Sequence, residues 1–259
     1  MKKTVREILS MKGKEKICML TAYDAPTAKL LSDAGIEIIL VGDSVANTLL
    51  GYESTKEISM NEMLHHTAAV ARAKPEALIV ADMPINSYEN KKIALRNAQR
   101  FLSAGADAVK IEGAKIEVVK ALRLKRIQVM GHLGLLPQSA KKFSVKGKNF
   151  EEAKRILDDA ILLERAGCFS IVLECIPAAL ASKITKSVSI PTIGIGAGPL
   201  CDGQVLVIND LLGFNADENF KPKFVKRYAN LNQEILRAVK EFRREVKERK
   251  FPSKELCYP

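Results

Sequence analysis

The chain has 259 residues, of which 47% are hydrophobic, and its 41 Lys and Arg against 30 Asp and Glu give a formal net charge of +11. This length and composition support a large buried core, which excludes a disordered or fibrous protein. No apolar run reaches the roughly 18 residues of a membrane-spanning helix, so we expect no membrane partner.

Short apolar runs alternate with segments of helical periodicity along most of the chain. The predicted strands are 16–23, 36–42, 77–81, 106–111, 127–131, 168–174, 190–195 and 204–208. The helices predicted between them are 25–34, 59–73, 90–104, 115–124, 150–166 and 178–188. Runs rich in Val, Ile and Leu are typical of parallel strands that are covered on both faces. Eight such strands favour a (β/α)8 TIM barrel, although the same alternation allows a doubly wound open sheet.

A different pattern follows the eighth strand. From Phe224 to Val246, apolar residues recur every three or four positions, which predicts an amphipathic helix of about six turns. Residues 221–259 also hold 12 basic and 5 acidic residues, so most of the net positive charge of the chain lies there. The net positive charge of residues 1–220 is too small to indicate a nucleic-acid surface. We predict one domain, residues 1–259, with a helical C-terminal extension over 221–259. Its apolar stripe either packs against the barrel or forms a subunit contact.

The cysteine pattern bears on the compartment. The five cysteines lie mostly inside apolar runs and form no C-x-x-C pair, which argues against zinc ribbons and redox motifs. The basic N-terminal residues are not followed by the apolar segment of a signal peptide. We therefore expect a reducing, cytoplasmic environment.

Three successive predicted strands lead into a carboxylate. Asp43 follows the second strand, Asp82 follows the third, and Glu112 follows the fourth. Adjacent strands lie about 4.8 Å apart, so these side chains can converge on one hard cation, Mg²⁺ first. Each acid alone is better explained as a turn or capping residue, but three at equivalent positions favour a metal site.

Other polar residues at strand ends have two explanations each. Lys110 and Glu112 are two apart on a strand and face the barrel interior, where an unpaired charge is costly. Either they pair with each other, or Lys110 binds a substrate carboxylate and Glu112 a metal. Glu174 ends the sixth strand, where it suits a general base but also a helix cap. His132 follows the fifth strand, and a buried core residue explains it as well as a functional residue does.

Taken together, these segments resemble the ketopantoate hydroxymethyltransferase family, also called 3-methyl-2-oxobutanoate hydroxymethyltransferase. They occur in family order and span about 190 residues. The matching segments are MLTAYDAPTAKLLSDAG (19–35), ILVGDSVANTLLGYEST (39–55), VADMP (80–84), VKIEG (109–113), GHLGLLPQSA (131–140), LECIP (173–177) and GIGAGPLCDGQVLV (194–207).

The resemblance implies a (β/α)8 barrel that binds one Mg²⁺ per subunit. Its members transfer a hydroxymethyl group from the co-substrate 5,10-methylenetetrahydrofolate to 3-methyl-2-oxobutanoate, which gives 2-dehydropantoate (ketopantoate) for pantothenate and coenzyme A. The residues that match the metal site are Asp43, Asp82 and Glu112. The residues that match the 2-oxo acid site are Asp43, Ser44, Asp82, Lys110 and His132. Glu174 matches the proton acceptor.

The resemblance also implies a homodecamer. Two alternatives from other classes remain at this point. Another Mg²⁺-dependent barrel enzyme, a lyase or mutase acting on a 2-oxo acid, would share the enolate chemistry but would not need the folate. A basic binding module would use residues 221–259 for nucleic acid, and its affinity would fall steeply with salt.

Overall fold

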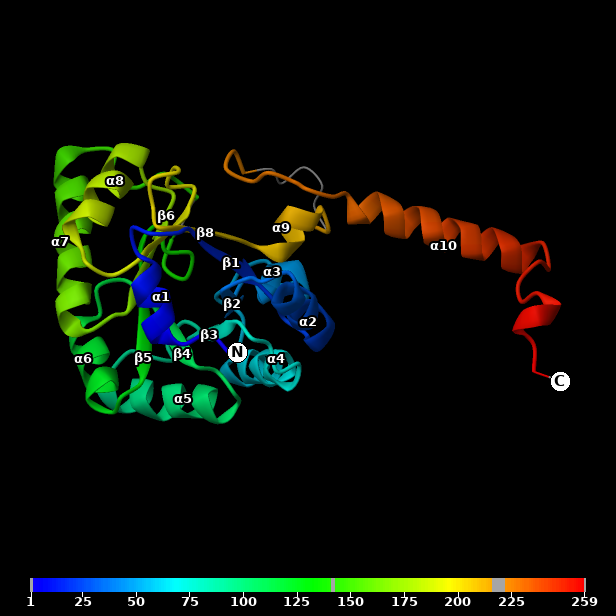
Figure 1. The fold of residues 1–259 in the computed structure, drawn as a ribbon, viewed down its shortest axis with the longest axis horizontal. Helices are drawn as coiled ribbons and strands as arrows, with labels where there is room; N and C mark the ends of the chain where they lie inside the picture. Colours follow the sequence, from blue (N-terminus) through cyan, green and yellow to red (C-terminus); the bar gives the residue numbers. More distant parts are fainter. Residues whose placement is uncertain (1, 141–142, 216–221, 259) are drawn as a thin grey trace. The chain divides into compact units, whose positions relative to one another are not determined.

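Eight parallel strands form a closed barrel, in which each strand pairs with the next and β8 pairs with β1 (Figure 1). The strands are β1 (Ile17–Thr21), β2 (Ile38–Val41), β3 (Leu78–Asp82), β4 (Ala108–Glu112), β5 (Gln128–Gly134), β6 (Ser170–Glu174), β7 (Thr192–Ile195) and β8 (Gly203–Leu206). The computed structural model describes all residues except 1, 141–142, 216–221 and 259. The closed order confirms the TIM barrel and excludes the open sheet. The chain divides into two compact units, 1–207 and 208–259.

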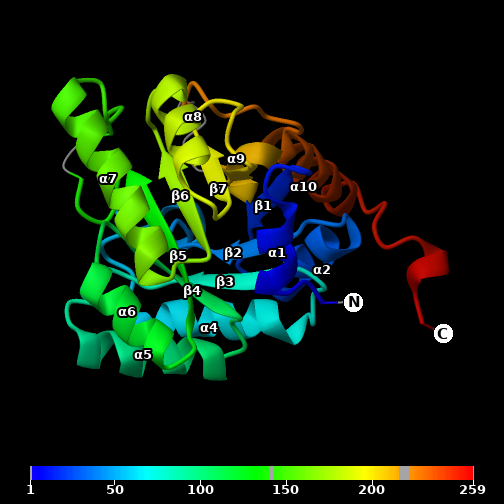
Figure 2. The same cartoon turned by 60° about the vertical axis from the view of Figure 1, so that its left-hand side comes forward.

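Helices surround the strands of the first unit (Figure 2). They are α1 (Val5–Met11), α2 (Ala25–Asp33), α3 (Val45–Thr48), α4 (Met60–Arg72), α5 (Lys91–Ser103), α6 (Ile116–Leu124), α7 (Phe150–Ala166) and α8 (Ala178–Ser187). The sequence predicted all of these except α1 and α3, which are too short to show a clear period. Thr4 and Glu7 begin α1 with a reciprocal capping box, which satisfies main-chain N–H groups at its first turn.

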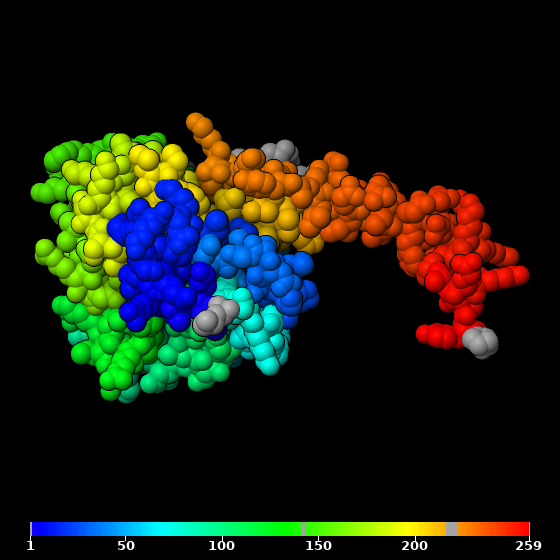
Figure 3. Space-filling view, in the orientation of Figure 1, coloured from blue at the N-terminus to red at the C-terminus, as the bar shows by residue number. Residues whose placement is uncertain are grey.

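The barrel interior is filled by side chains that alternate along the strands, and α1 closes its amino end. Ile8 and Met11 of α1 belong to the same buried cluster as the inward residues of the strands. Those inward residues include Ile17, Met19, Ile38, Leu40, Leu78, Val80, Ala108, Met130, Val172, Ile193 and Val205. Figure 3 shows the N-terminal segment, in dark blue, lying over one face of this unit. The apolar core thus occupies the amino half of the barrel and leaves the carboxyl ends of the strands for polar side chains.

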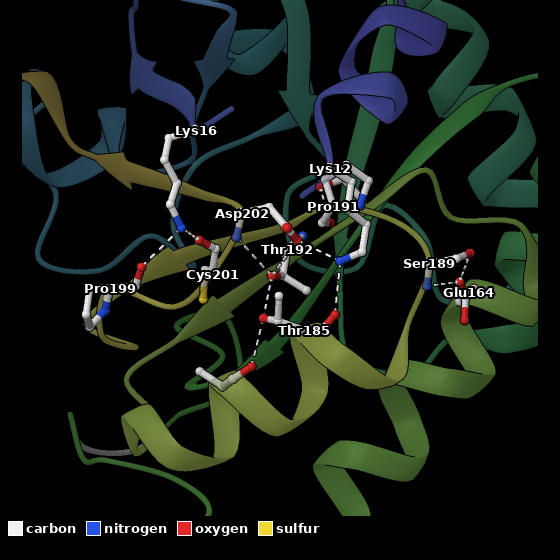
Figure 4. Close-up of polar contacts among 12 residues, drawn as sticks. Lys12, Lys16, Glu164, Thr185, Ser189, Pro191, Thr192, Pro199, Cys201 and Asp202 are labelled. Carbon is white, nitrogen blue, oxygen red and sulfur yellow. Dashed lines mark hydrogen bonds and ion pairs between the residues drawn. The ribbon is translucent and has the colours of Figure 1, made fainter. Parts of the chain in front are cut away.

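A hydrogen-bonded group, which we call the amino-end network, consists of Lys12, Thr185, Thr192 and Asp202 (Figure 4). Lys12 Nζ donates to Asp202 Oδ2 at 2.8 Å and to the Thr185 carbonyl oxygen at 3.0 Å. The same Asp202 oxygen accepts the Thr192 main-chain N–H at 2.9 Å. The network therefore ties the end of α1 to α8 and to the loop before β8.

The second unit contains α9 (Ile208–Leu212), α10 (Leu231–Lys247) and the 3₁₀ helix η1 (Lys254–Leu256). The predicted amphipathic helix begins later than Phe224, because the Tyr228 main-chain N–H donates to the Leu211 carbonyl instead of to a helical turn. All residues of α10 are described and none is buried. Its exposed apolar residues are Ile235, Leu236, Val239, Phe242 and Val246. Lys221, where we predicted the extension to begin, lies outside the described residues.

No helix in the described part of the chain is long and apolar enough to cross a membrane. The five cysteines, all of them described, are unpaired.

Candidate active site

Charged side chains of neighbouring strands meet at the carboxyl end of the barrel. Three of them lie on the inward faces of β3 and β4: Asp82, Lys110 and Glu112. Asp82 is two residues beyond the core residue Val80, and Lys110 and Glu112 are two and four residues beyond Ala108. The strand register places Asp82 beside Lys110, Glu112 beside His132, and Gly134 beside Glu174. We call the resulting group the carboxylate cluster; its members are Asp43, Asp82, Lys110, Glu112, His132 and Glu174.

Asp43, Asp82 and Lys110 form one half of this cluster, and all three are buried. The Asp43 main-chain N–H donates to Asp82 Oδ2 at 3.1 Å, and Lys110 Nζ lies 2.6 Å from Asp82 Oδ1. Lys110 therefore pairs with Asp82 across β3 and β4, not with Glu112 on its own strand, as one of our two explanations had it. A Cβ added at Gly42 would lie 2.9 Å from Ser44 Oγ, so a larger residue at this position would displace the Ser44 side chain.

The electrostatics of this half favour an added positive charge. Burial, followed by the negative charge of Asp82, raises the pKa of Asp43 to about 7. Burial lowers the pKa of Lys110, but Asp82, Asp43 and Glu112 outweigh it and hold this pKa above its usual value. Lys110 thus stays charged and faces three carboxylates, so a cation bound here would relieve their mutual repulsion.

His132 lies between two glutamates in the other half of the cluster. Its Nδ1 is 3.5 Å from Glu112 Oε1, and its Nε2 is 3.1 Å from Glu174 Oε2. Burial and Lys110 lower the pKa of His132, but the two glutamates outweigh them and raise it to about 9. The Glu174 side chain is 14% exposed against 5% for Glu112, so Glu174 is the more accessible carboxylate of this half.

The backbone around Glu174 is tightly packed. Gly134 on the neighbouring strand has a φ of +96°, and an added Cβ there would collide with the Glu174 carbonyl oxygen. Cys175 also has a positive φ, of 48°, and its main-chain N–H donates to the Ile195 carbonyl at 2.9 Å. These contacts fix the end of β6 and therefore the starting point of the Glu174 side chain.

Ser44, predicted to bind the 2-oxo acid, lies beside Asp43 at the start of α3. Its hydroxyl is 2.8 Å from the Tyr23 hydroxyl. Burial raises the pKa of Tyr23 to about 12, so this phenol keeps its proton. Ser44 is thus held next to the carboxylate cluster, and its role in substrate binding stays a prediction.

Two buried residues that the sequence argument did not place in the site also contact the cluster. Gln138 donates from Nε2 to Asp43 Oδ2 at 2.8 Å, and Tyr88 donates its hydroxyl proton to Gln138 Oε1 at 2.5 Å. Gln138 lies within the motif GHLGLLPQSA, but no strand or helix period marks it as inward-facing. The signal that could have indicated it is a polar side chain that follows an apolar, proline-containing stretch, Leu135 to Pro137.

Two of the three carboxylates that were predicted to bind Mg²⁺ lie side by side, and the third makes other contacts. Among the described residues, no group of three or more His, Cys, Asp or Glu side chains is arranged to hold a metal ion. Glu112 is directed elsewhere, since its Oε2 accepts the Gln138 main-chain N–H at 3.1 Å and its Oε1 faces His132. Asp43 and Asp82 remain as adjacent carboxylates, and Mg²⁺ is commonly bound by one or two carboxylates together with water and substrate oxygens. The three-carboxylate site stays a prediction.

A cavity of about 820 Å³ adjoins the cluster. Its lining includes Gly113, which directly follows Glu112 at the end of β4. It also includes Gly134 of β5, which pairs with Glu174 of β6. On the other side it is lined by Lys146, Arg155 and further residues of α7 and the preceding loop. The volume lies in the range of small-molecule sites.

Comparisons with known proteins place the chain among close relatives. The family model described as ketopantoate hydroxymethyltransferase matches residues 2–254. A protein of Thermotoga neapolitana named 3-methyl-2-oxobutanoate hydroxymethyltransferase is 54% identical over 257 residues, covering 97% of this chain and 94% of the relative. A protein of Syntrophomonas wolfei with the same name is 50% identical, covering 95% and 91%.

A solved structure resembles the fold at much lower identity. The phosphoenolpyruvate phosphomutase of Streptomyces platensis subsp. rosaceus matches with a TM-score of 0.64 and 15% identity, covering 98% of this chain and 91% of that one. At this identity the likeness concerns the fold alone.

Proposed function

The chain belongs to the ketopantoate hydroxymethyltransferase family and is a transferase enzyme, and we propose that it transfers a hydroxymethyl group from 5,10-methylenetetrahydrofolate to 3-methyl-2-oxobutanoate. The product would be 2-dehydropantoate (ketopantoate), a precursor of pantothenate and coenzyme A. The observation that carries the proposal is the meeting of two adjacent aspartates, a buried lysine and a histidine between two glutamates at one end of the barrel.

In this proposal Lys110 and Ser44 bind the carboxylate and keto groups of the 2-oxo acid. Lys110 is suited to this because it is buried and keeps its charge. Asp43 and Asp82 would hold Mg²⁺, and Glu112 adds negative charge from the next strand. When bound, Mg²⁺ supplies a positive charge that stabilises developing negative charge on the substrate's keto oxygen.

Glu174 is the proposed general base. It would remove the proton from C3 of the 2-oxo acid, and a positioned base of this kind contributes roughly 10²–10⁴-fold to a rate. His132 contacts Glu174 through Nε2 and thereby orients the carboxylate. The resulting enolate carbon would form a bond to the methylene carbon, and water would supply the hydroxyl oxygen on that carbon. Both bonds from the methylene carbon to the folate nitrogens would break, and these nitrogens would take up the C3 proton and one proton of the water, which gives tetrahydrofolate.

Other parts of the molecule support the co-substrate and the assembly. The adjoining cavity has a volume in the range of small-molecule sites, which supports it as the place of the one-carbon donor, and its lining contains two basic residues, Lys146 and Arg155, and two acidic residues, Glu152 and Asp159. The exposed apolar stripe of α10 supports a homo-oligomer, which we propose to be a decamer. The unpaired cysteines support a cytoplasmic location.

The alternatives are less well supported. The lyase or mutase alternative rests on a fold likeness at 15% identity, whereas relatives at 50–54% identity are named as hydroxymethyltransferases. A nucleic-acid module does not account for the buried carboxylates of the barrel.

Proton NMR of 3-methyl-2-oxobutanoate in D₂O tests the proposal. We expect Mg²⁺-dependent loss of the C3 proton signal, and a new hydroxymethyl signal only when tetrahydrofolate and formaldehyde are added. Exchange without transfer under any condition would point to an enolising barrel enzyme with another acceptor. Absence of exchange would contradict the roles given to Glu174 and the two aspartates.

A further inference from the structure

Gln138 has a hydrogen-bond partner for every polar group of its side chain, although it is 3% exposed and comes from a loop. Its Nε2 donates to Asp43 Oδ2 at 2.8 Å and to the Met83 carbonyl at 3.0 Å. Its Oε1 accepts the Tyr88 hydroxyl, and its main-chain N–H donates to Glu112 Oε2 at 3.1 Å. Asp43, Met83 and Glu112 lie at the ends of β2, β3 and β4, so one residue joins three consecutive strand ends.

The chemistry of the partners fixes the orientation of the Gln138 amide. A carboxylate and a main-chain carbonyl can only accept, so the NH₂ group must face Asp43 and Met83. Tyr88 then donates to the remaining oxygen. Burial, together with the charge of Glu112, holds the pKa of Tyr88 above its usual value, so the phenol stays a donor. The Glu112 main-chain N–H donates to the Tyr88 oxygen at 3.4 Å, which links Tyr88 to the end of β4.

The loop around Gln138 is itself held in place. The Leu136 carbonyl accepts the main-chain N–H groups of Ser139 at 3.0 Å and Ala140 at 2.9 Å, which closes a turn around Gln138. The side chain therefore projects from a fixed turn, and its orientation is set before any ligand binds.

We propose that Gln138 is a positioning residue that holds Asp43 in the orientation in which it receives a divalent cation, and that fixes the neighbouring carboxylate of Glu112. The inference rests on the proposed function, because it assumes a cation at Asp43 and Asp82. Because Gln138 engages Oδ2 of Asp43, the other carboxylate oxygen is the one that would bind the cation. By donating to Glu112 Oε2 from its main-chain N–H, it fixes the carboxylate of Glu112, whose Oε1 lies 3.5 Å from His132 Nδ1. Hydrogen-bond partners of ligating carboxylates are worth roughly 10–100-fold in metal affinity.

The test is a titration of the full-length protein with Mn²⁺, followed by electron paramagnetic resonance of the free ion, without substrate. The Gln138→Met variant keeps the length of the side chain but removes both donors and the acceptor of the amide. We expect its Mn²⁺ dissociation constant to rise about 10–100-fold. Tyr88→Phe removes one hydroxyl and leaves Gln138 less well oriented, so we expect a smaller rise in the same direction.

Gln128→Met is the matched control, since Gln128 begins β5 and its Oε1 accepts from Arg123 at 2.6 Å, away from the cluster. We expect this variant to bind Mn²⁺ as the wild type does. Unchanged Mn²⁺ affinity in Gln138→Met and Tyr88→Phe, with a lower unfolding temperature, would overturn the inference and leave Gln138 a structural residue. If Gln138→Met does not fold, the Mn²⁺ dissociation constant of Tyr88→Phe tests the inference.

The same titration separates this inference from the proposed function. Failure of the wild-type protein to bind Mn²⁺ would overturn the metal site of the proposed function and the inference with it. Binding by the wild type, with no loss in the variants, would overturn the inference alone. A second measurement is the KM for 3-methyl-2-oxobutanoate, which we expect to rise in Gln138→Met and to stay unchanged in Gln128→Met.

Discussion

The two ends of the barrel both contain buried charges, but they are arranged differently. In the amino-end network the single carboxylate of Asp202 meets the ammonium of Lys12 and the N–H of Thr192. In the carboxylate cluster four carboxylates have Lys110 and His132 as their positive neighbours. Negative charge is thus matched at the amino end and in excess at the carboxyl end.

Hydrogen bonding follows the same division. Among the described residues, five buried side-chain polar atoms lack a hydrogen bond of good geometry, and three of them belong to the carboxylate cluster: Asp82 Oδ1 and both ring nitrogens of His132. These atoms make ion-pair contacts instead. Excess charge and poorly satisfied polar atoms are costly in a folded protein, so their concentration at one end marks the place where a ligand completes the structure.

The largest expected effect is on catalysis, from the carboxyl end. Glu174→Gln keeps the shape of the side chain but cannot accept the C3 proton, so we expect exchange of that proton to fall by roughly 10²–10⁴-fold. Proton NMR in D₂O measures this, and the unfolding temperature should change little. Exchange at the wild-type rate would show that Glu174 is not the base.

Asp43→Asn separates function from stability at the same end. The change removes one of two adjacent buried negative charges, while the amide oxygen can still accept from Gln138. We expect Mn²⁺ binding to weaken by at least about tenfold, in line with the loss of a ligand's charge. We also expect the metal-free protein to gain about 0.5–2 kcal/mol in free energy of unfolding, as often happens when active-site strain is relieved.

Denaturant unfolding in the presence of EDTA measures the stability change. A loss of stability in Asp43→Asn would contradict the excess of negative charge in the cluster, and wild-type Mn²⁺ affinity would remove Asp43 from the metal site.

Lys12→Met is expected to have the opposite pair of effects. The substitution leaves the buried Asp202 carboxylate without its cation, which should lower the free energy of unfolding by about 1–3 kcal/mol. The exchange rate at 25 °C should stay at the wild-type value, because the network lies at the other end of the barrel. Reduced exchange in a fully folded Lys12→Met protein would contradict the separation of the two ends.

Much of this arrangement could be predicted from the sequence, because strands have a period of two and end at recognisable positions. That period placed Lys110 and Glu112 on the inward face, and the structure confirms it. The pairing of Lys110 with Asp82 could not be chosen over pairing with Glu112, since both partners are within reach from sequence spacing.

Other features depend on contacts distant in the sequence. Gln138 and Tyr88 reach the cluster from loops, where no period indicates the direction of a side chain. Strand β5 extends to Gly134, beyond the predicted end at 131, because its last residues pair with β6 despite two glycines of low strand propensity. The local sequence disfavours a strand at these residues, but their pairing with β6 stabilises one.

The smallest expected effect comes from an exposed ion pair. Its contribution to the free energy of unfolding is the reference against which that of the amino-end network is compared. Lys91 Nζ lies 2.8 Å from Glu117 Oε2, the same distance as in the Lys12–Asp202 pair, but its side chain is 57% exposed against 18% for Lys12. We expect Lys91→Met to change the free energy of unfolding by no more than about 1 kcal/mol, because water screens the pair. Denaturant unfolding of both variants side by side makes the comparison. Since the ion-pair distance is equal, the difference between the two losses reflects burial together with the hydrogen bond from Lys12 to the Thr185 carbonyl. Equal losses would show that the amino-end network contributes no more than a surface ion pair.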